Sequence, residues 1–221
     1  MPQKIKIAIN GFGRIGRNAF KIALTKKNLA VVAINDLTDT KTLAQLLGHD
    51  TVYGAYEKKV GFTKDALIVA GKKYKVLAEK EPDKLPWKKL EVDVVLECTG
   101  RFTDKKSSGL HLKAGAKRVV ISAPAKDESI KTLILGVNKN EFNPKKDLIV
   151  SNGSCTTNCL APVFKVLKDE FGVEKAVMST IHSYTATQNL VDGPHKNLRE
   201  ARAAAQNIIP TDTGATKAIV A

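Results

Sequence analysis

The chain has 221 residues, 43% of them hydrophobic, and a formal net charge of +14. It has no apolar run as long as a membrane span and no signal-peptide segment at its start, so we expect a soluble, cytoplasmic protein with no membrane partner. The lysines are scattered, with no basic run of five or more and no aromatic RNA-binding signature, so the charge favours a solvated surface that attracts anionic small molecules over nucleic-acid binding.

The first 35 residues have the pattern of a complete β-α-β unit. Residues 4–10 alternate as a strand, residues 16–28 have helical spacing, and residues 29–35 have the composition of a buried strand. The apolar positions expected to lie on one face of this helix are Ile15, Ala19, Ile22 and Ala23.

Strands and helices continue to alternate as far as residue 150. We expect a short helix near 39–47, a β-rich patch at 60–77, a strand at 92–98, a helix at 104–114, and strands at 117–123 and 131–137. This order predicts an α/β fold with a parallel, doubly wound sheet.

The pattern changes after residue 150, where we place a domain boundary that gives domains 1–150 and 151–221. A helix is expected at 155–171, stopped by Gly172 and kinked at Pro162. Its apolar stripe would consist of Leu160, Val163, Phe164, Leu167 and Phe171. A long strand at 174–185 is expected to follow.

Three glycines, Gly11, Gly13 and Gly16, follow the first strand with G-x-G-x-x-G spacing and open the helix. This context predicts a dinucleotide site, because the glycines permit a tight turn, close approach of a pyrophosphate and close helix packing. Asp36 lies twenty residues past Gly16, where a carboxylate can bind a ribose and repel a 2′-phosphate, so NAD is favoured over NADP. Thr99 ends another strand at the same edge and is expected to line the same crevice.

The chain has three cysteines, Cys98, Cys155 and Cys159. Three thiols without a close-set histidine pair do not make a metal site, and an odd count without a signal peptide indicates free thiols in a reducing compartment. Cys155 and Cys159 could be buried structural residues. Cys155, however, begins the helix expected at 155–171, where the helix dipole favours a thiolate nucleophile, and Cys159 one turn further in is expected to be the structural thiol.

His182 ends the strand expected at 174–185 and lies 27 residues after Cys155, so a return of the chain can bring its imidazole to the sulfur. A lone histidine on a strand is more often structural. His49, His111 and His195 lie in helical or loop contexts without hydroxyl-rich surroundings, so they compete poorly for a catalytic role.

Five motifs resemble phosphorylating glyceraldehyde-3-phosphate dehydrogenase along the whole chain: INGFGRIGR, ISAPAKD, SNGSCTTNCLAP, HSYTATQ and RAAAQNIIPTDTGATKA. The resemblance implies a Rossmann-type NAD-binding domain followed by an incomplete α+β catalytic domain. It also implies oxidation of glyceraldehyde 3-phosphate, with NAD and inorganic phosphate, to 1,3-bisphosphoglycerate by a cytoplasmic homotetramer.

The resemblance also assigns roles to residues. Cys155 would attack the aldehyde and His182 would act as its base. The cofactor would contact Gly11, Phe12, Gly13, Arg14, Ile15, Asp36, Lys80, Thr99 and Ser122. One phosphate would contact Ser154, Thr156, Thr213 and Gly214, and the other Thr185 and Thr187. The same hydroxyls could instead cap helices and turns.

Two departures from the family pattern matter. Lys80 stands where many relatives have an arginine beside the adenine, which keeps a charge but loses the planar fork. The family's chain also continues beyond Ala221, so this chain is expected to be truncated. Two alternatives stay open: an erythrose-4-phosphate dehydrogenase, and a non-catalytic fragment that binds NAD or RNA.

Overall fold

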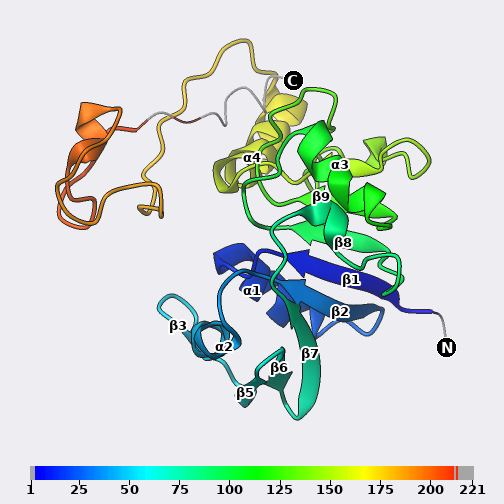
Figure 1. Ribbon diagram of the computed structural model, residues 1–221. Coiled ribbons are helices and arrows are strands. Elements are labelled where there is room, and N and C mark those ends of the chain that lie inside the picture. The colour runs from blue at the N-terminus through cyan, green and yellow to red at the C-terminus, as the bar shows by residue number, and fades with distance from the viewer. Residues whose placement is uncertain (1–2, 212, 214–221) are drawn as a thin grey trace.

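The computed structural model describes residues 3–211 and residue 213 (Figure 1). The strands are β1 Ile5–Asn10, β2 Leu29–Asn35, β3 His49–Asp50, β4 Gly54–Ala55, β5 Val60–Thr63, β6 Ala66–Val69, β7 Lys72–Leu77, β8 Val94–Glu97, β9 Arg118–Ile121 and β10 Ile149–Ser151. The α-helices are α1 Arg14–Ala23, α2 Thr40–Gly48, α3 Lys105–Lys113 and α4 Cys155–Phe171. Short 3-10 helices cover Pro82–Lys84, Lys139–Glu141 and Leu198–Ala201.

One eight-stranded sheet has the order β10-β9-β8-β1-β2-β7-β6-β5, and β3 pairs with β4 separately. The strands from β10 to β7 run parallel, while β6 and β5 add an antiparallel edge. The predicted α/β fold with a doubly wound sheet is confirmed. The chain reverses its direction of winding at β1, which lies between β8 and β2, and ligands of such sheets bind at this point, beyond the carboxyl ends of the strands.

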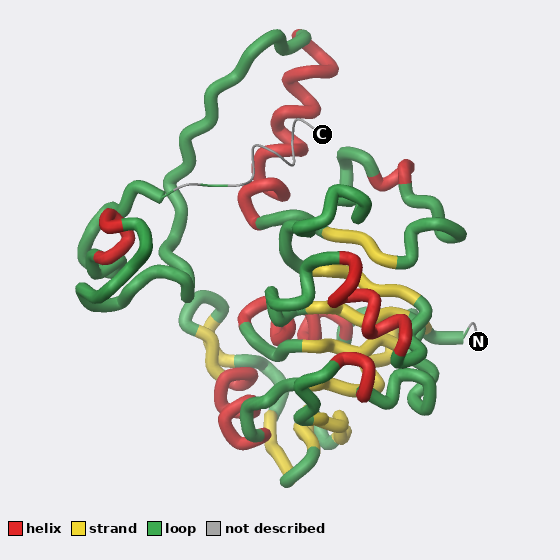
Figure 2. Tube along the Cα trace, turned by 45° about the horizontal axis from the view of Figure 1, so that its top comes forward, coloured by secondary structure: helices red, strands yellow, loops and turns green. Residues whose placement is uncertain are grey.

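The sheet has a hydrophobic core on each face, with helices on both sides of the strands in Figure 2. Ile7 and Ile9 of β1 belong to one core, with residues of α1 and α2, while Ala8 between them belongs to the other, with Trp87. This alternation is the period of two expected of a strand that is covered on both faces. The core therefore fixes which side chains can reach the carboxyl edge.

The buried face of α1 differs from the predicted stripe. Ile15 is 53% exposed and Ile22 is 58% exposed, whereas Phe20 and Gly16 are buried. Gly16 must face the sheet because a side chain there would collide with the preceding loop, and this orientation turns Ile15 and Ile22 outward. The prediction for these two isoleucines is therefore wrong.

Residues 131–137 do not form the predicted strand. Thr132 makes one isolated parallel bridge with Ser151. The Asn138 side chain then accepts a hydrogen bond from the Ile134 N–H and donates one to the Thr132 carbonyl. A local side chain thus occupies backbone groups that a longer ladder would need, and the segment turns.

The helix α4 begins at Cys155 and ends before Gly172, as predicted, and it continues through Pro162. Its predicted apolar stripe is largely exposed: Leu167 is 45% exposed and Phe171 is 80% exposed. Ala161 and Thr157 are the buried residues of this helix. Leu160 and Phe164 are half-buried, so the stripe is covered only in part and its C-terminal end is exposed.

The strand predicted at 174–185 is absent from the described residues, and a long irregular segment leaves α4 instead (Figure 2). Alternating side chains favour an extended backbone, but a strand also needs a neighbour to complete its hydrogen bonds. Within residues 3–211, no strand pairs with this segment. His182 therefore lies on an extended loop and not at a strand end.

Candidate functional site

Two of the three fingerprint glycines are packed where no side chain fits. Gly11 has a φ of +89°, and a Cβ atom there would lie 2.7 Å from the Thr99 backbone nitrogen. A Cβ atom on Gly16 would lie 2.1 Å from the Gly11 carbonyl oxygen. A Cβ atom on Gly13 would meet nothing in the described chain within 4 Å. The loop is thus tight at the first and third glycines and open at the second, the position that the fingerprint reserves for a pyrophosphate.

The helix α1 begins at this open position. Gly13 is its N-cap and makes no side-chain capping bond, and the first turn contains no acidic residue. The N–H groups of a first helical turn have no partner within the helix, and the helix dipole gives them a partial positive charge. The residues present therefore fit a bound anion such as the pyrophosphate of a dinucleotide.

Asp36 follows β2 and faces the glycine loop. Its Oδ2 accepts a hydrogen bond from the Phe12 N–H at 2.6 Å, and its Oδ1 accepts one from the Thr38 N–H at 2.9 Å. Each carboxylate oxygen retains a lone pair, so Asp36 can also accept a ribose hydroxyl. Its bond to the loop was not predicted, and it ties the end of β2 to the glycine turn.

Phe12 and Arg14 have side chains that are directed away from the open position. Phe12 is 1% exposed and packs edge-on against Phe20. The Arg14 guanidinium contacts Asp50, with 2.6 Å between Nη1 and Oδ2. The hydrogen bond from Arg14, together with the Tyr53 N–H, holds the pKa of the Asp50 carboxyl well below its usual range. Neither side chain is therefore available to a ligand at the open position, and the Phe12 N–H is already bound to Asp36.

Ile15 and Ser122 line a hollow of about 260 Å³ together with Cys98. The Thr99 N–H does not point to open space, because it donates to the buried Glu97 carboxylate at 2.8 Å. Lys80 is exposed in the segment after β7. The structure therefore gathers the predicted cofactor residues at the carboxyl edge of the sheet, on the segments that follow β1, β2, β7, β8 and β9.

The structure brings Cys155 and His182 together. Cys155 is the exposed first residue of α4, and its Sγ lies 3.1 Å from Nε2 of His182. Nδ1 of His182 lies 2.7 Å from the Ser183 carbonyl oxygen, which can only accept, so Nδ1 carries a proton. Nε2 is therefore the atom that can take the proton of the thiol.

The surroundings lower the pKa of the Cys155 thiol. Partial burial acts to raise this pKa, but the hydrogen bond and charge of His182, with the N–H and hydroxyl of Thr156, outweigh it. The pKa of His182 is raised, first by the Ser183 carbonyl and then by Cys155. Both shifts favour a thiolate beside an imidazolium, which is the reactive form of a cysteine nucleophile.

The predicted phosphate-binding hydroxyls have local partners. Ser154 is the N-cap of α4, and its Oγ accepts from the Thr157 N–H at 2.9 Å. The Thr185 and Thr187 hydroxyls lie 2.9 Å apart. Thr156 faces the Cys155 sulfur, Thr213 is exposed, and Gly214 lies outside the described residues.

The other two thiols differ from Cys155. Burial raises the pKa of the Cys98 thiol to about 11, although a hydrogen bond with Ser122 opposes the shift. Cys159 is exposed, so the expectation of a structural thiol packed inside the molecule is wrong. The helix turns Cys159 outward because Thr157 and Ala161 occupy its buried face.

Sequence reasoning missed a buried pair beneath the cofactor loops. Glu97 and His111 are 1% and 0% exposed, and their Oε2 and Nε2 atoms lie 2.9 Å apart. In the sequence, His111 lies in a helical context without hydroxyl-rich surroundings, and so competes poorly for a catalytic role. The available signal was Glu97 itself, a carboxylate that ends the apolar strand β8, because a buried charge is nearly always paired.

Residues 3–211 and 213 offer neither a metal site nor a membrane-spanning helix. No group of three or more His, Cys, Asp or Glu side chains in this part of the chain is placed to hold a metal ion. Among its helices, none has the length and apolar character needed to cross a membrane.

The chain matches two family models of one enzyme. Residues 5–105 match the NAD binding domain of glyceraldehyde 3-phosphate dehydrogenase, and residues 154–221 match the C-terminal domain of the same family. The second match includes both Cys155 and His182.

Curated relatives are similar over nearly the whole chain. Glyceraldehyde-3-phosphate dehydrogenase from Geobacillus stearothermophilus is 53% identical over 215 residues, which are 97% of this chain and 64% of the relative. The protein of this name from Thermotoga maritima is 54% identical over 216 residues, with the same coverage. Glyceraldehyde-3-phosphate dehydrogenase 1 from Bacillus cereus is 55% identical over 214 residues. The chain thus spans 64% of the length of these relatives.

Proposed function

The chain belongs to the glyceraldehyde-3-phosphate dehydrogenase family, and on that premise we propose that the protein oxidises glyceraldehyde 3-phosphate with NAD and inorganic phosphate to 1,3-bisphosphoglycerate. The observation that carries this proposal is the 3.1 Å contact between Cys155 Sγ and His182 Nε2 at the start of α4. It joins a thiol of lowered pKa to an imidazole that can accept its proton.

In the proposed reaction, the Cys155 thiolate attacks the aldehyde carbon and forms a thiohemiacetal. The N–H groups at the start of α4 stabilise the developing oxyanion, and His182 gives it the proton that it took from the thiol. His182 takes this proton back as the carbon is oxidised. NAD, when bound, supplies the acceptor for the hydride. Inorganic phosphate then cleaves the thioester, which releases the acyl phosphate and restores the thiolate.

NAD would be held by the edge of the sheet. Gly13 and the start of α1 would bind the pyrophosphate, and Asp36 would accept the adenosine ribose hydroxyls. The backbone of residues 11–15, with Lys80, Thr99 and Ser122, would complete the cofactor site. The open space at Gly13 and the two further lone pairs of Asp36 support this arrangement.

The two phosphate groups of the reaction would be held by hydroxyls near Cys155 and His182. Ser154 and Thr156, with Thr213 and Gly214, would bind one phosphate, and Thr185 and Thr187 the other. The position of Ser154 and Thr156 at a helix N-terminus supports this part of the proposal, because such a position favours anions.

We assign residues 1–150 to the cofactor domain and residues 151–221 to the substrate domain. The last strand of the sheet, β10, ends at Ser151 and α4 begins at Cys155, which supports a boundary close to residue 150. We further propose that the protein works in the cytoplasm as a homotetramer.

A direct assay tests the proposal. The purified protein is expected to form NADH from NAD and glyceraldehyde 3-phosphate only when inorganic phosphate is present. Iodoacetamide should stop this activity, with the label on Cys155 in peptide mass spectra. Faster turnover of erythrose 4-phosphate would instead assign the protein to that substrate, and labelling mainly at Cys159 would refute the proposed nucleophile.

A further inference from the structure

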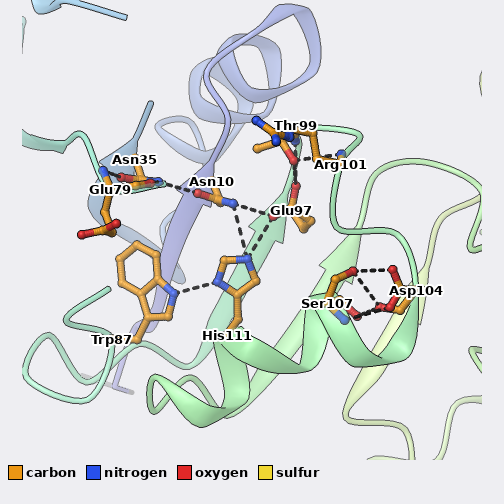
Figure 3. A network of polar contacts seen from close by, with 11 residues as sticks. Asn10, Asn35, Glu79, Trp87, Glu97, Thr99, Arg101, Asp104, Ser107 and His111 are labelled. Carbon is orange, nitrogen blue, oxygen red and sulfur yellow. Dashed lines mark hydrogen bonds and ion pairs between the residues drawn. The ribbon is translucent and has the colours of Figure 1, made fainter. Parts of the chain in front are cut away.

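A chain of buried side chains runs beneath the cofactor loops (Figure 3). Trp87, His111, Glu97, Asn10 and Asn35 are each at most 5% exposed and are joined by hydrogen bonds. They come from β1, β2, α3, the end of β8 and the segment before it. We call these five residues the relay.

The indole of Trp87 fixes the proton positions at one end of the relay. Trp87 Nε1 donates to His111 Nδ1 at 3.0 Å, and an indole N–H can only donate. Nδ1 therefore carries no proton, so Nε2 is the protonated atom and donates to Glu97 Oε2 at 2.9 Å. His111 is thus a neutral imidazole of one defined tautomer.

Glu97 is the centre of the relay, because only hydrogen-bond donors surround it. Oε2 accepts from His111 Nε2 and from Asn10 Nδ2, the latter at 2.6 Å. Oε1 accepts from the Thr99 N–H at 2.8 Å and from the Thr99 hydroxyl. A carboxylate, which has acceptors only, satisfies all four donors, whereas an amide would place an NH₂ group among them.

The relay continues from Asn10 to the far side of the site. Asn10 Oδ1 accepts from Asn35 Nδ2 at 2.7 Å. Asn35 in turn bonds both backbone groups of Glu79, accepting from its N–H at 2.9 Å and donating to its carbonyl oxygen at 2.9 Å.

The relay reaches the backbone beside each of four loops of the proposed cofactor site. Asn10 precedes Gly11, Asn35 precedes Asp36, and Glu79 precedes Lys80. Glu97 holds the Thr99 backbone, which itself lies against Gly11. The four loops thus share one continuous buried support.

We propose that this relay sets the mutual spacing of the four loops that hold NAD, and that Glu97 and Asn35 act as positioning residues for the bound dinucleotide. The inference rests on the proposed NAD site. Because the relay is continuous, loss of the hydrogen bonds of Glu97 should loosen the segment at Lys80, on the opposite side of the site.

Calorimetric titration of NAD into folded variants tests the proposal. Glu97→Gln and Asn35→Ala are each expected to raise the Kd for NAD about tenfold. Glu97→Gln places an NH₂ group among buried donors, and Asn35→Ala leaves Asn10 Oδ1 and both backbone groups of Glu79 without their partner. Ser108→Ala is the matched control: it also removes a buried hydrogen bond, from α3, but outside the relay. It should leave the Kd within about twofold.

The double variant distinguishes a relay from two separate supports. If the relay acts as one unit, the combined Glu97→Gln and Asn35→Ala change should raise the Kd by much less than the product of the single effects. In turnover assays, the KM for NAD should rise while kcat at saturating NAD stays near the wild-type value. Effects on the Kd that multiply, or folded single variants that bind NAD normally, would overturn the proposal.

Hydrogen exchange without NAD separates this inference from the proposed function. Glu97→Gln should accelerate exchange about tenfold at the Thr99 amide and also at the Glu79 amide, while Ser108→Ala should change neither. If the wild type binds no NAD, the proposed cofactor site fails, and unchanged exchange at Glu79 refutes the relay itself. Should Glu97→Gln not fold, Trp87→Phe is expected to give a smaller change of the same kind, about threefold.

Discussion

The two halves of the proposed active site are held in different ways. On the cofactor side, each loop follows a strand of one sheet, and buried bonds such as that of Glu97 to Thr99 fix the loop from below. On the nucleophile side, His182 belongs to an irregular segment whose neighbours Val177 and Ile181 are fully exposed. Its imidazole contacts Cys155 and its own neighbour Ser183.

This difference shows two routes to a defined geometry. The sheet positions the cofactor loops through buried contacts of residues that are not themselves proposed to touch NAD. The Cys155 and His182 pair, in contrast, is positioned largely by the interaction that makes it reactive. Substitution of Cys155 or His182 should therefore remove a reactive group without moving the rest of the site. Substitution at the edge of the sheet should instead change the positions of the loops that hold NAD.

The largest effect is expected from Cys155→Ser, which removes the thiolate. Turnover should fall by at least about 10⁴-fold, because loss of a nucleophile removes the covalent route. Calorimetry should show that NAD still binds, since the cofactor loops do not depend on the pair. Cys159→Ser is the control and should keep near-normal turnover. Loss of NAD binding in Cys155→Ser would contradict the independence of the two halves.

His182→Asn should lower turnover by roughly 10²–10⁴-fold, because it removes the base. It should also slow iodoacetamide labelling of Cys155, since the imidazole helps to hold the thiol pKa down. Rapid chemical quench and mass spectrometry would measure both. Normal labelling in this variant would show that the helix start alone activates the thiol.

The pH dependence of labelling sharpens the same point. A lowered pKa means that the Cys155 thiolate persists below the pH at which an ordinary thiol, with a pKa of about 8.5, becomes protonated. The labelling midpoint of Cys155 should therefore lie below that of an ordinary thiol and move upward in His182→Asn. Cys98, with a pKa raised to about 11, should stay unlabelled in the folded protein throughout this range.

Asp36→Ala should reduce the preference for NAD over NADP about tenfold, because it removes an acceptor for the ribose and a charge that repels a 2′-phosphate. The ratio of kcat/KM for the two cofactors measures the effect. Asp36 also holds the Phe12 N–H, so affinity for NAD itself should fall. Equal use of both cofactors by the wild type would contradict the placement of Asp36.

The smallest effect is expected from Ser154→Ala, which removes the N-cap of α4 and should destabilise that helix by about 1 kcal/mol. Because α4 is largely exposed, hydrogen exchange should show the loss in α4 and leave the sheet unchanged. Asp104→Ala removes the N-cap of α3, which packs on the sheet. It should therefore lower the Tm of the thermal transition in which the sheet unfolds. A similar loss of Tm in both variants would argue against the contrast between the two halves.

Sequence patterns correctly predicted features that depend on neighbouring residues alone, such as turns and helix ends. The glycine spacing predicted the turn before α1, and Cys155 and Gly172 were placed correctly at the ends of α4. Patterns failed where the outcome depends on a distant partner. Ile15 and Ile22 fit a helical stripe, but contact of Gly16 with the Gly11 loop decides which face of α1 is buried.

The candidate site follows the same division. The contact of Cys155 with His182 was expected from the motifs, although the strand predicted to present His182 is an irregular loop. The Glu97 and His111 pair was missed, because its members come from β8 and α3 and the sequence marks only Glu97, the carboxylate that ends an apolar strand, without indicating its partner. Polar side chains that are far apart in the sequence and meet only in the folded chain form no motif of fixed spacing, so the sequence does not predict their contact.

The irregular segment from α4 to His182 should also be cleaved by proteases before the rest of the molecule. Exposed, irregular backbone is the preferred place for cleavage, and the segment between Gly172 and His182 has this character, whereas the strands of the sheet do not. A single cut there would separate His182 from Cys155, the proposed base and nucleophile, while leaving the cofactor edge intact. Limited digestion should therefore yield a product that keeps its ability to bind NAD but has lost the proposed acyl transfer.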